Sequence, residues 1–235
     1  MRGRQLGEAD RILTLFTLER GKLDAVAKGV RRARSHLAGR VELFTECDFL
    51  MHRGRSLDVI VSAEIRRSPW ARLVEPSRYA VAGVVVELID AFCEPDLALP
   101  DVYELLVAAI AAIAASSSPR ALLPRFSLRL LEMLGLAPPL HSCVRCGGDL
   151  PAGTVWLDAQ SGGLIGPECR ERGYALPELH EADVANLRAL ALPKGDAGGA
   201  ALLATAGAAA AVDELVAHHL GKRPKAIGQL AGLGA

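Results

Sequence analysis

Residues 12–30 read ILTLFTLERGKLDAVAKGV and carry the strongest fold signal in the chain. Two apolar runs, 12–18 and 23–30, flank the turn residues 19–22. Gly21 in that turn supplies the positive backbone angle that a tight hairpin needs. The stretch therefore predicts a β-hairpin.

A second pair of runs follows the same plan. Residues 41–51 and 56–65 flank His52-Arg53-Gly54-Arg55, another turn-forming segment. Short strands with turn signals about every ten residues are typical of a small antiparallel barrel or sandwich. We expect residues 1–72 to form an all-β domain.

Beyond Pro69-Trp70 the apolar residues recur at helical spacing. The pattern predicts helices at 79–92, 102–115 and 122–136, and further helices at 181–192 and 212–220. A Gly/Ala-rich segment, 196–211, gives little packing information. The expected fold class is a multidomain α+β chain, divided into a β domain at 1–72, a helical domain at 73–140, a cysteine-containing insert at 141–175 and a C-terminal helical part at 176–235.

Composition indicates a folded protein, because apolar residues make up 51% and charged residues 23% of the chain. The longest apolar stretch, 105–115, is shorter than the roughly 20 residues that cross a bilayer. The first ten residues are charged and lack the features of a secretory signal. We therefore expect a cytoplasmic protein that does not engage membranes, and the five cysteines fit a reducing compartment.

The zero net charge hides two parts of opposite sign. Residues 1–72 carry 15 basic and 9 acidic side chains, a net of +6, and the remainder has a net of −6. Between positions 20 and 40, Asp24 is the only acid, and 30–40 has too few apolar residues for a core element. Such a loop could bind phosphates without base preference and with strong salt dependence, although isolated charge runs are more often merely solvated. The predicted DNA-binding residues are Arg20, Lys22, Lys28, Arg31, Arg32, Arg34 and Arg40.

The sequence gives less support for stacking of DNA bases on aromatic side chains than for electrostatic binding of the DNA backbone. Barrels that hold single strands usually add exposed aromatic side chains to a basic groove. Between residues 11 and 65 the aromatics are Phe16, Phe44 and Phe49, all within apolar runs where core packing is the expected role.

Cys143 and Cys146 form a Cys-x-x-Cys knuckle followed by two glycines, a shape that lets two thiolates converge on one zinc ion. Cys169 supplies a third thiol, whereas a second Cys-x-x-Cys pair would need a cysteine at position 166, which is glycine. His141 adjoins the knuckle and could complete the set. The candidate metal ligands are thus Cys143, Cys146 and Cys169, with zinc as the possible cofactor; the alternative is a metal-free remnant with small buried thiols.

Catalytic motifs are absent: the chain has no phosphate loop, no nucleophile elbow and no dinucleotide-binding glycine pattern. A zinc ion held by three thiolates and one water would have the number of protein ligands that is typical of a catalytic zinc site. However, Glu168 is the nearest candidate base, and no His-x-Glu or His-Glu-x-x-His signature accompanies it. We expect no enzymatic activity.

Several motifs together resemble the N-terminal domain of bacterial RecO proteins. The most specific is LGEADRILTLFT at residues 6–17, followed by GKL at 21–23 and AKGVRR at 27–32. The likeness continues through 35–37, 42–44 and 57–64, and the cysteine insert and HLGKR at 219–223 fall where the family has a zinc module and a terminal helix.

The resemblance implies an OB-fold β-barrel followed by an α-helical domain carrying a zinc-ribbon-like insert. It also implies a nucleoid-associated recombination mediator in DNA repair that binds single- and double-stranded DNA, anneals strands, joins RecR and recognises single-strand-binding protein while aiding RecA loading. The alternative function is a helical protein-interaction adaptor in which DNA binding is incidental.

Two features depart from the family. About ten residues that precede Leu6 in the family, forming the first barrel strand, are missing, which suggests a misplaced start and an open barrel edge that invites association. Gly166 replaces a zinc cysteine, which puts metal binding in question.

Overall fold

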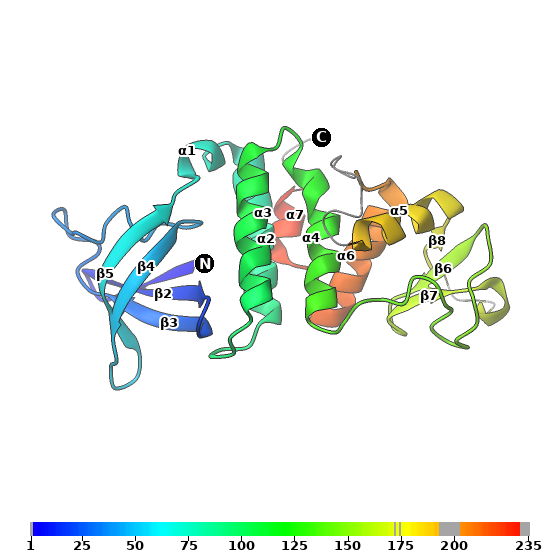
Figure 1. The fold of residues 1–235 in the computed structure, drawn as a ribbon, viewed down its shortest axis with the longest axis horizontal. Helices are drawn as coiled ribbons and strands as arrows, with labels where there is room; N and C mark the ends of the chain where they lie inside the picture. The colour runs from blue at the N-terminus through cyan, green and yellow to red at the C-terminus, as the bar shows by residue number, and fades with distance from the viewer. Residues whose placement is uncertain (1, 172, 174, 193–202, 231–235) are drawn as a thin grey trace. The chain divides into compact units, whose positions relative to one another are not determined.

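The computed structural model describes residues 2–171, 173, 175–192 and 203–230 (Figure 1). Its contacts divide the chain into two compact units. The first comprises residues 2–119 together with 229–230, and the second comprises residues 120–228. The four segments predicted from the sequence are thus grouped differently, because the first two predicted helices belong with the β-sheet.

The first unit opens with a five-stranded sheet in the order β1-β2-β3-β5-β4. All neighbouring strands are antiparallel except β3 and β5, which pair in parallel at Ala25–Asp58 and Val26–Val59. The sheet is open, because β1 and β4 do not pair with each other, but its strand order is OB-like. The strands are β1 (Arg2–Leu6), β2 (Asp10–Thr17), β3 (Gly21–Ala27), β4 (Glu46–His52) and β5 (Asp58–Arg67).

The residues up to Leu6 form a strand, so a strand does precede β2 in this chain. Strand β1 pairs antiparallel with β2 from Arg2–Thr14 to Leu6–Asp10. Polar and glycine residues dominate β1, so its sequence gives no strand signal, and the neighbouring strand β2 supplies the partners of its backbone. Residues Leu15 to Thr17 of β2 extend beyond the Arg2–Thr14 pair, where the described pairing with β1 ends.

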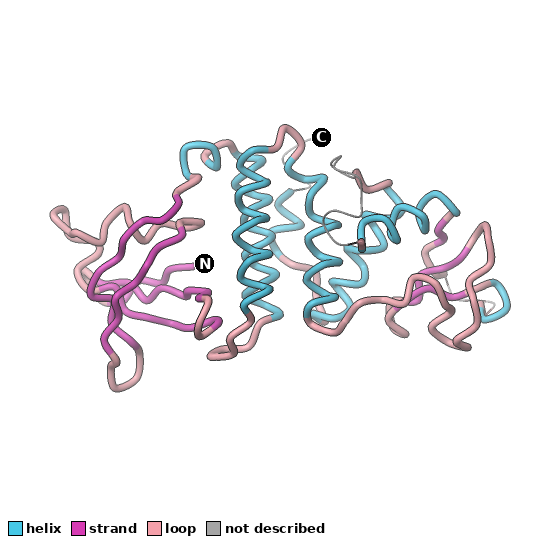
Figure 2. Tube along the Cα trace, in the orientation of Figure 1, coloured by secondary structure: helices cyan, strands magenta, loops and turns pink. Residues whose placement is uncertain are grey.

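Alternate residues of the strands fill the core of the sheet, as the period-two pattern requires. The buried cluster includes Leu13 and Leu15 of β2. On β5 the buried residues Ile60 and Ala63 are three apart, because a register shift against β4 lies between them. Leu37, from the long loop between β3 and β4, also enters this cluster with 1% exposure. Figure 2 shows this loop as the long connection that precedes β4.

Three helices follow in the same unit: α1 (Trp70–Leu73), α2 (Pro76–Phe92) and α3 (Pro100–Ala115). Helices α2 and α3 confirm the helices predicted at 79–92 and 102–115, and each begins two or three residues earlier, at a proline in the first helical turn. The short α1 was not predicted. Helices α2 and α3 pack against each other, and the ring of Phe16 on β2 stacks on Tyr103 of α3 at 6.5 Å.

In the second unit, three helices pack on one another. Helix α6 begins earlier than the predicted 212–220, because Thr205 accepts a hydrogen bond from the Ala208 N–H and alanines favour helix. A further helix, α7, follows it. Residues 196–202 of the Gly/Ala-rich segment lie outside the described residues. From residue 119 onward, the elements of the chain are η1 (Pro119–Leu122), α4 (Leu123–Met133), β6 (Val155–Asp158), β7 (Gly163–Ile165), η2 (Pro167–Cys169), β8 (Glu178–Leu179), α5 (Glu181–Ala191), α6 (Ala206–Leu220) and α7 (Lys225–Leu230).

Within the described part of the chain, no helix has the length and apolar character needed to span a membrane.

Gly21 offers a test of how the sheet joins the helices. Its φ is +65°, and an added Cβ would lie 1.8 Å from the carbonyl oxygen of Leu97. Gly7 has a similar φ of +61° but open space around it. We expect Gly7→Ala to lower the free energy of unfolding by about 1 kcal/mol and Gly21→Ala by about 3 kcal/mol or more, measured by urea denaturation. Equal losses would show that the Leu97 loop yields without cost.

Candidate nucleic-acid interface and cysteine cluster

The basic loop between β3 and β4, residues 28–40, is anchored at its start. The Gly29 N–H donates to the carboxylate of Asp10 at 2.7 Å, and the Arg31 N–H donates to the carbonyl of Ala9 at 3.0 Å. Val30 is buried beside them. The first half of the loop is therefore fixed against the turn between β1 and β2.

The second half of the loop follows strand β5. The ring of His36 lies 3.2 Å from the carbonyl oxygen of Val61, and the guanidinium of Arg40 donates to the carbonyl of Ala63 at 3.0 Å. Together with the buried Leu37, these contacts hold the loop along the sheet. A loop fixed in this way loses less conformational entropy on binding than a free one.

Six of the seven predicted DNA-binding side chains are exposed, and four of these six have no hydrogen-bond or ion-pair partner among the described residues. Lys28, Arg31, Arg32 and Arg34 are exposed, and no acidic partner for their side chains is found among the described residues. Cations without an intramolecular partner can neutralise phosphates at no cost in broken ion pairs. These four side chains form what we call the cationic loop.

The other three predicted side chains have partners inside the first unit. Arg20 pairs with Asp58 at 2.5 Å and with Asp96 at 3.3 Å, and the hydrogen bond to Asp58 raises its pKa. Lys22 is mostly buried and bonds the carbonyl of Asp90 at 2.5 Å. Arg40 bonds β5, as described above. The sequence could not reveal these partners, because most of them come from distant segments.

Two further cations were missed. Arg53 and Arg55 lie exposed in the turn between β4 and β5. The signal was present in the sequence, since the predicted turn His52-Arg53-Gly54-Arg55 is itself basic, but its residues were considered only as a turn.

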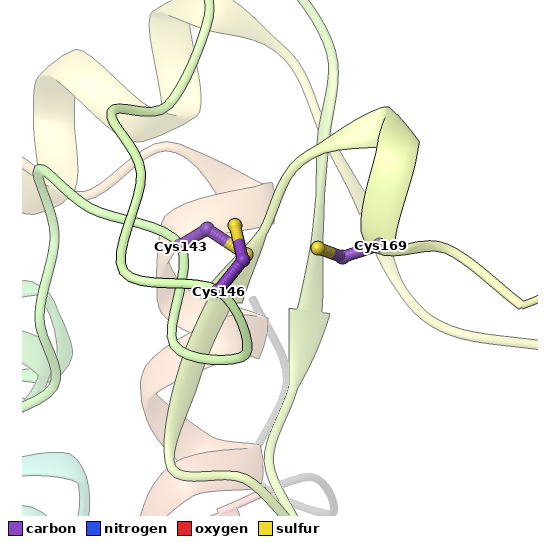
Figure 3. A group of neighbouring side chains, drawn as sticks. All are labelled: Cys143, Cys146 and Cys169. Atoms are coloured by element: carbon purple, nitrogen blue, oxygen red, sulfur yellow. The ribbon is translucent and has the colours of Figure 1, made fainter.

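The three candidate metal ligands do come together. The Sγ atoms of Cys143, Cys146 and Cys169 all lie within 4.8 Å of one another (Figure 3). Cys143 and Cys146 lie on one turn, closed by hydrogen bonds from Gly147 N–H to Cys143 O at 2.8 Å and from Cys143 N–H to Gly148 O at 2.7 Å. Cys169 lies at the end of η2, and its thiol meets the thiols of the Cys143–Cys146 knuckle.

The fourth corner of a tetrahedral site has no protein ligand. Among the described residues, no histidine or carboxylate joins the three thiols, so His141 does not complete the set. At Gly166 a Cβ would meet only the Cδ of Pro151, at an ordinary 3.5 Å, and its φ of −79° suits any residue. The cluster therefore fits zinc with three thiolates and leaves one position for an outside ligand.

The backbone around the cluster favours a thiolate. Burial raises the pKa of Cys143, but hydrogen bonds from the backbone N–H groups of Cys146, Gly166 and Arg145 outweigh burial and lower it to about 6. Hydrogen bonds with the Cys146 and Cys143 thiols raise the pKa of Cys169 to about 12. Such a set of N–H donors is suited to sulfur that carries negative charge.

The insert is also held by contacts that need no metal. Arg145 pairs with the buried Asp158 at 2.8 Å and donates to the carbonyl of Cys169 at 3.2 Å. The guanidinium of Arg170 lies 4.5 Å from the centroid of the Trp156 ring. Trp156 and Ile165 are buried with Cys143. These contacts give the insert a small core of its own.

Comparison with known proteins adds a second, independent line of evidence. The family model described as "Recombination protein O N terminal" matches residues 1–69, and the one described as "Recombination protein O C terminal" matches residues 74–226. The match to the C-terminal model alone covers more than half of the chain.

Curated relatives agree with the family models. A "DNA repair protein RecO" of Bifidobacterium longum is 40% identical over 168 residues, which cover 70% of this chain and 69% of the relative. Proteins of the same name are 37% identical over 183 residues in Nocardioides (75% and 74% covered) and 38% identical over 181 residues in Frankia casuarinae (74% and 72% covered). With its OB-like sheet, its helical units and its cysteine cluster, the chain belongs to the RecO family of DNA repair and recombination proteins.

Proposed function

We propose that the protein is a recombination mediator, acting without covalent chemistry, that binds single- and double-stranded DNA irrespective of sequence through the cationic loop. The observation that carries this proposal is the set of four exposed cations, without acidic partners among the described residues, on a loop fixed to an OB-like sheet. Family membership supports the further steps: annealing of complementary strands, joining of RecR, and loading of RecA onto DNA coated by single-strand-binding protein in the nucleoid.

A salt series tests DNA binding. Four phosphate contacts predict that the logarithm of the association constant for a single-stranded oligonucleotide falls with a slope of about −3 against the logarithm of salt concentration. Two oligonucleotides of unrelated sequence should give the same slope and affinities within about threefold. Fluorescence anisotropy provides the measurement. A slope near zero, or a strong sequence preference, would contradict electrostatic capture of the backbone.

Strand annealing separates mediation from mere binding. Complementary labelled strands should anneal faster with the protein than without it, both naked and coated by single-strand-binding protein. If the protein co-purified with single-strand-binding protein at salt that strips DNA but did not accelerate annealing, the adaptor function would replace the mediator function.

We also propose that the cysteine cluster binds zinc in a structural role. The three convergent thiols and the backbone N–H groups that favour a thiolate support this proposal. Bound there, zinc would cross-link the knuckle turn to η2 through Cys143, Cys146 and Cys169.

A further inference from the structure

Three aromatic rings meet at the surface of the first unit. They come from separate segments: Phe44 from the loop before β4, Trp70 from the start of α1, and Tyr79 from α2. The ring centroids of Phe44 and Tyr79 are 5.4 Å apart, and those of Trp70 and Tyr79 are 6.0 Å apart. Phe44 therefore does not have the role in the barrel core that the sequence predicted, whereas Phe49 does pack against that core.

The rings are accessible although they touch. Trp70 is 39% and Tyr79 is 38% exposed. The planes in the two pairs are inclined by 82° and 80°, so the contacts are edge-on and cover less of the ring faces than parallel stacking would. The chain has two tryptophans and three tyrosines, and one residue of each type is exposed in this cluster.

The backbone also indicates a purpose for Phe44. Its φ is +64°, a left-handed conformation that costs a bulky residue about 1–2 kcal/mol. Such outliers persist where the surrounding structure holds them, and they are concentrated at functional sites. Here the outlier brings the phenylalanine against Tyr79.

The surface next to Phe44 carries both charges, because the cleft that Phe44 lines has Arg66, Arg67 and Arg72 on it and also Glu42, Glu46 and Asp48. Arg66 and Arg67 end strand β5 just before Trp70, and Arg72 lies two residues beyond Trp70 in α1. Phe44 and these three arginines all line the same cleft, which has a volume of about 950 Å³. Arg66 pairs with Asp48 at the surface, where solvent screens the pair. Arg67 pairs at 3.5 Å with Glu46, whose side chain is 19% exposed, and Arg72 is exposed.

We propose that Phe44, Trp70 and Tyr79 form a stacking platform for unpaired nucleobases, with Arg66, Arg67 and Arg72 holding the adjoining phosphates. Aromatic faces beside cations are what single-stranded nucleic acid requires, and stacking tolerates any base. Bases in a duplex already stack on one another and cannot use the platform. This inference rests on the proposed DNA-binding function and adds to it a preference for single strands over duplex.

Trp70 can report its own contact. In a Trp156→Phe background, Trp70 is the sole tryptophan, and the replaced indole is buried, with 8% exposure. We expect the fluorescence of Trp70 to be quenched by oligothymidine and to change little with a duplex of equal length. Far-ultraviolet circular dichroism checks that the background variant is folded. Equal quenching by the duplex, or no quenching by oligothymidine that is bound by anisotropy, would overturn the platform.

Affinity measurements complete the test. Trp70→Ala and Tyr79→Ala should each lower the affinity for oligothymidine by about tenfold or more, with less than a twofold change for the duplex. Trp70→Phe should retain most of the affinity, because it keeps an aromatic face. Leu50→Ala, which removes another exposed apolar side chain of the same unit, is the matched control and should change neither affinity.

The outcomes distinguish this inference from the proposed function. If the wild-type protein binds DNA but Trp70→Ala and Tyr79→Ala leave single-strand affinity unchanged, the platform is refuted and the cationic loop stands. If the two variants lose affinity for single-strand-binding protein but keep their affinity for DNA, the platform is refuted and the rings are a protein-docking surface instead. If the wild type binds no DNA at low salt, the proposed function fails as well.

Discussion

Replacing Arg31, Arg32 and Arg34 with glutamate is expected to lower the affinity for single-stranded DNA by about a hundredfold or more at low salt. Each arginine that contacts a phosphate displaces condensed counterions, so its loss flattens the salt dependence by about one unit of slope. Reversal also adds repulsion at three positions. The slope should therefore become less negative by about two units in the triple variant, because three phosphate contacts are lost while Lys28 remains.

The folded structure should survive this change. The three side chains are exposed, and the contacts that anchor the loop are made by the backbone N–H of Arg31 and by the buried Val30 and Leu37. Thermal unfolding of the variant should consequently match that of the wild type within a few degrees.

A variant with the same change in charge elsewhere separates local contact from net charge. Arg120, Lys222 and Arg223 are exposed and lie outside the first unit's sheet. Reversing all three to glutamate should lower affinity only a few-fold, because a general field is screened beyond about 10 Å. If both triple variants lost the same affinity, net charge and not the cationic loop would explain the binding.

Gly166→Cys is expected to raise zinc affinity on the order of a hundredfold, because a fourth thiolate replaces an exchangeable outside ligand. The substitution should be tolerated sterically. The backbone at this position has ordinary angles, and the new Cβ would meet only the Cδ of Pro151 at 3.5 Å. Competition with a chromophoric chelator measures the affinity.

Cobalt(II) substitution offers a readout of the ligand set itself. The thiolate-to-cobalt absorption should be stronger in Gly166→Cys than in the wild type, in proportion to four thiolates against three. Ala159→Cys, which adds a thiol in the turn between β6 and β7, is the matched control and should leave both affinity and spectrum unchanged. No zinc bound by the wild type at micromolar concentration would refute the three-thiolate site, whereas equal gains in both variants would point to adventitious thiol binding.

Much of the fold followed from local pattern. Apolar runs that flank turn residues predicted strands β2 to β5 to within about five residues, and apolar residues at helical spacing predicted α2 and α3. Strand β1 escaped prediction because a short polar segment becomes a strand only when a neighbour such as β2 supplies its hydrogen bonds.

The sequence by itself determined that a basic β domain precedes helices and a cysteine knuckle, because residue spacing and local charge are properties of the chain. Only the tertiary structure decided which cations remain available. Arg20 and Lys22 are bound to Asp58 and Asp90, which lie far away in sequence. Tertiary packing likewise gathered Phe44, Trp70 and Tyr79 at one surface. The physical reason is that partnership between side chains depends on distances across the fold, which no local pattern encodes.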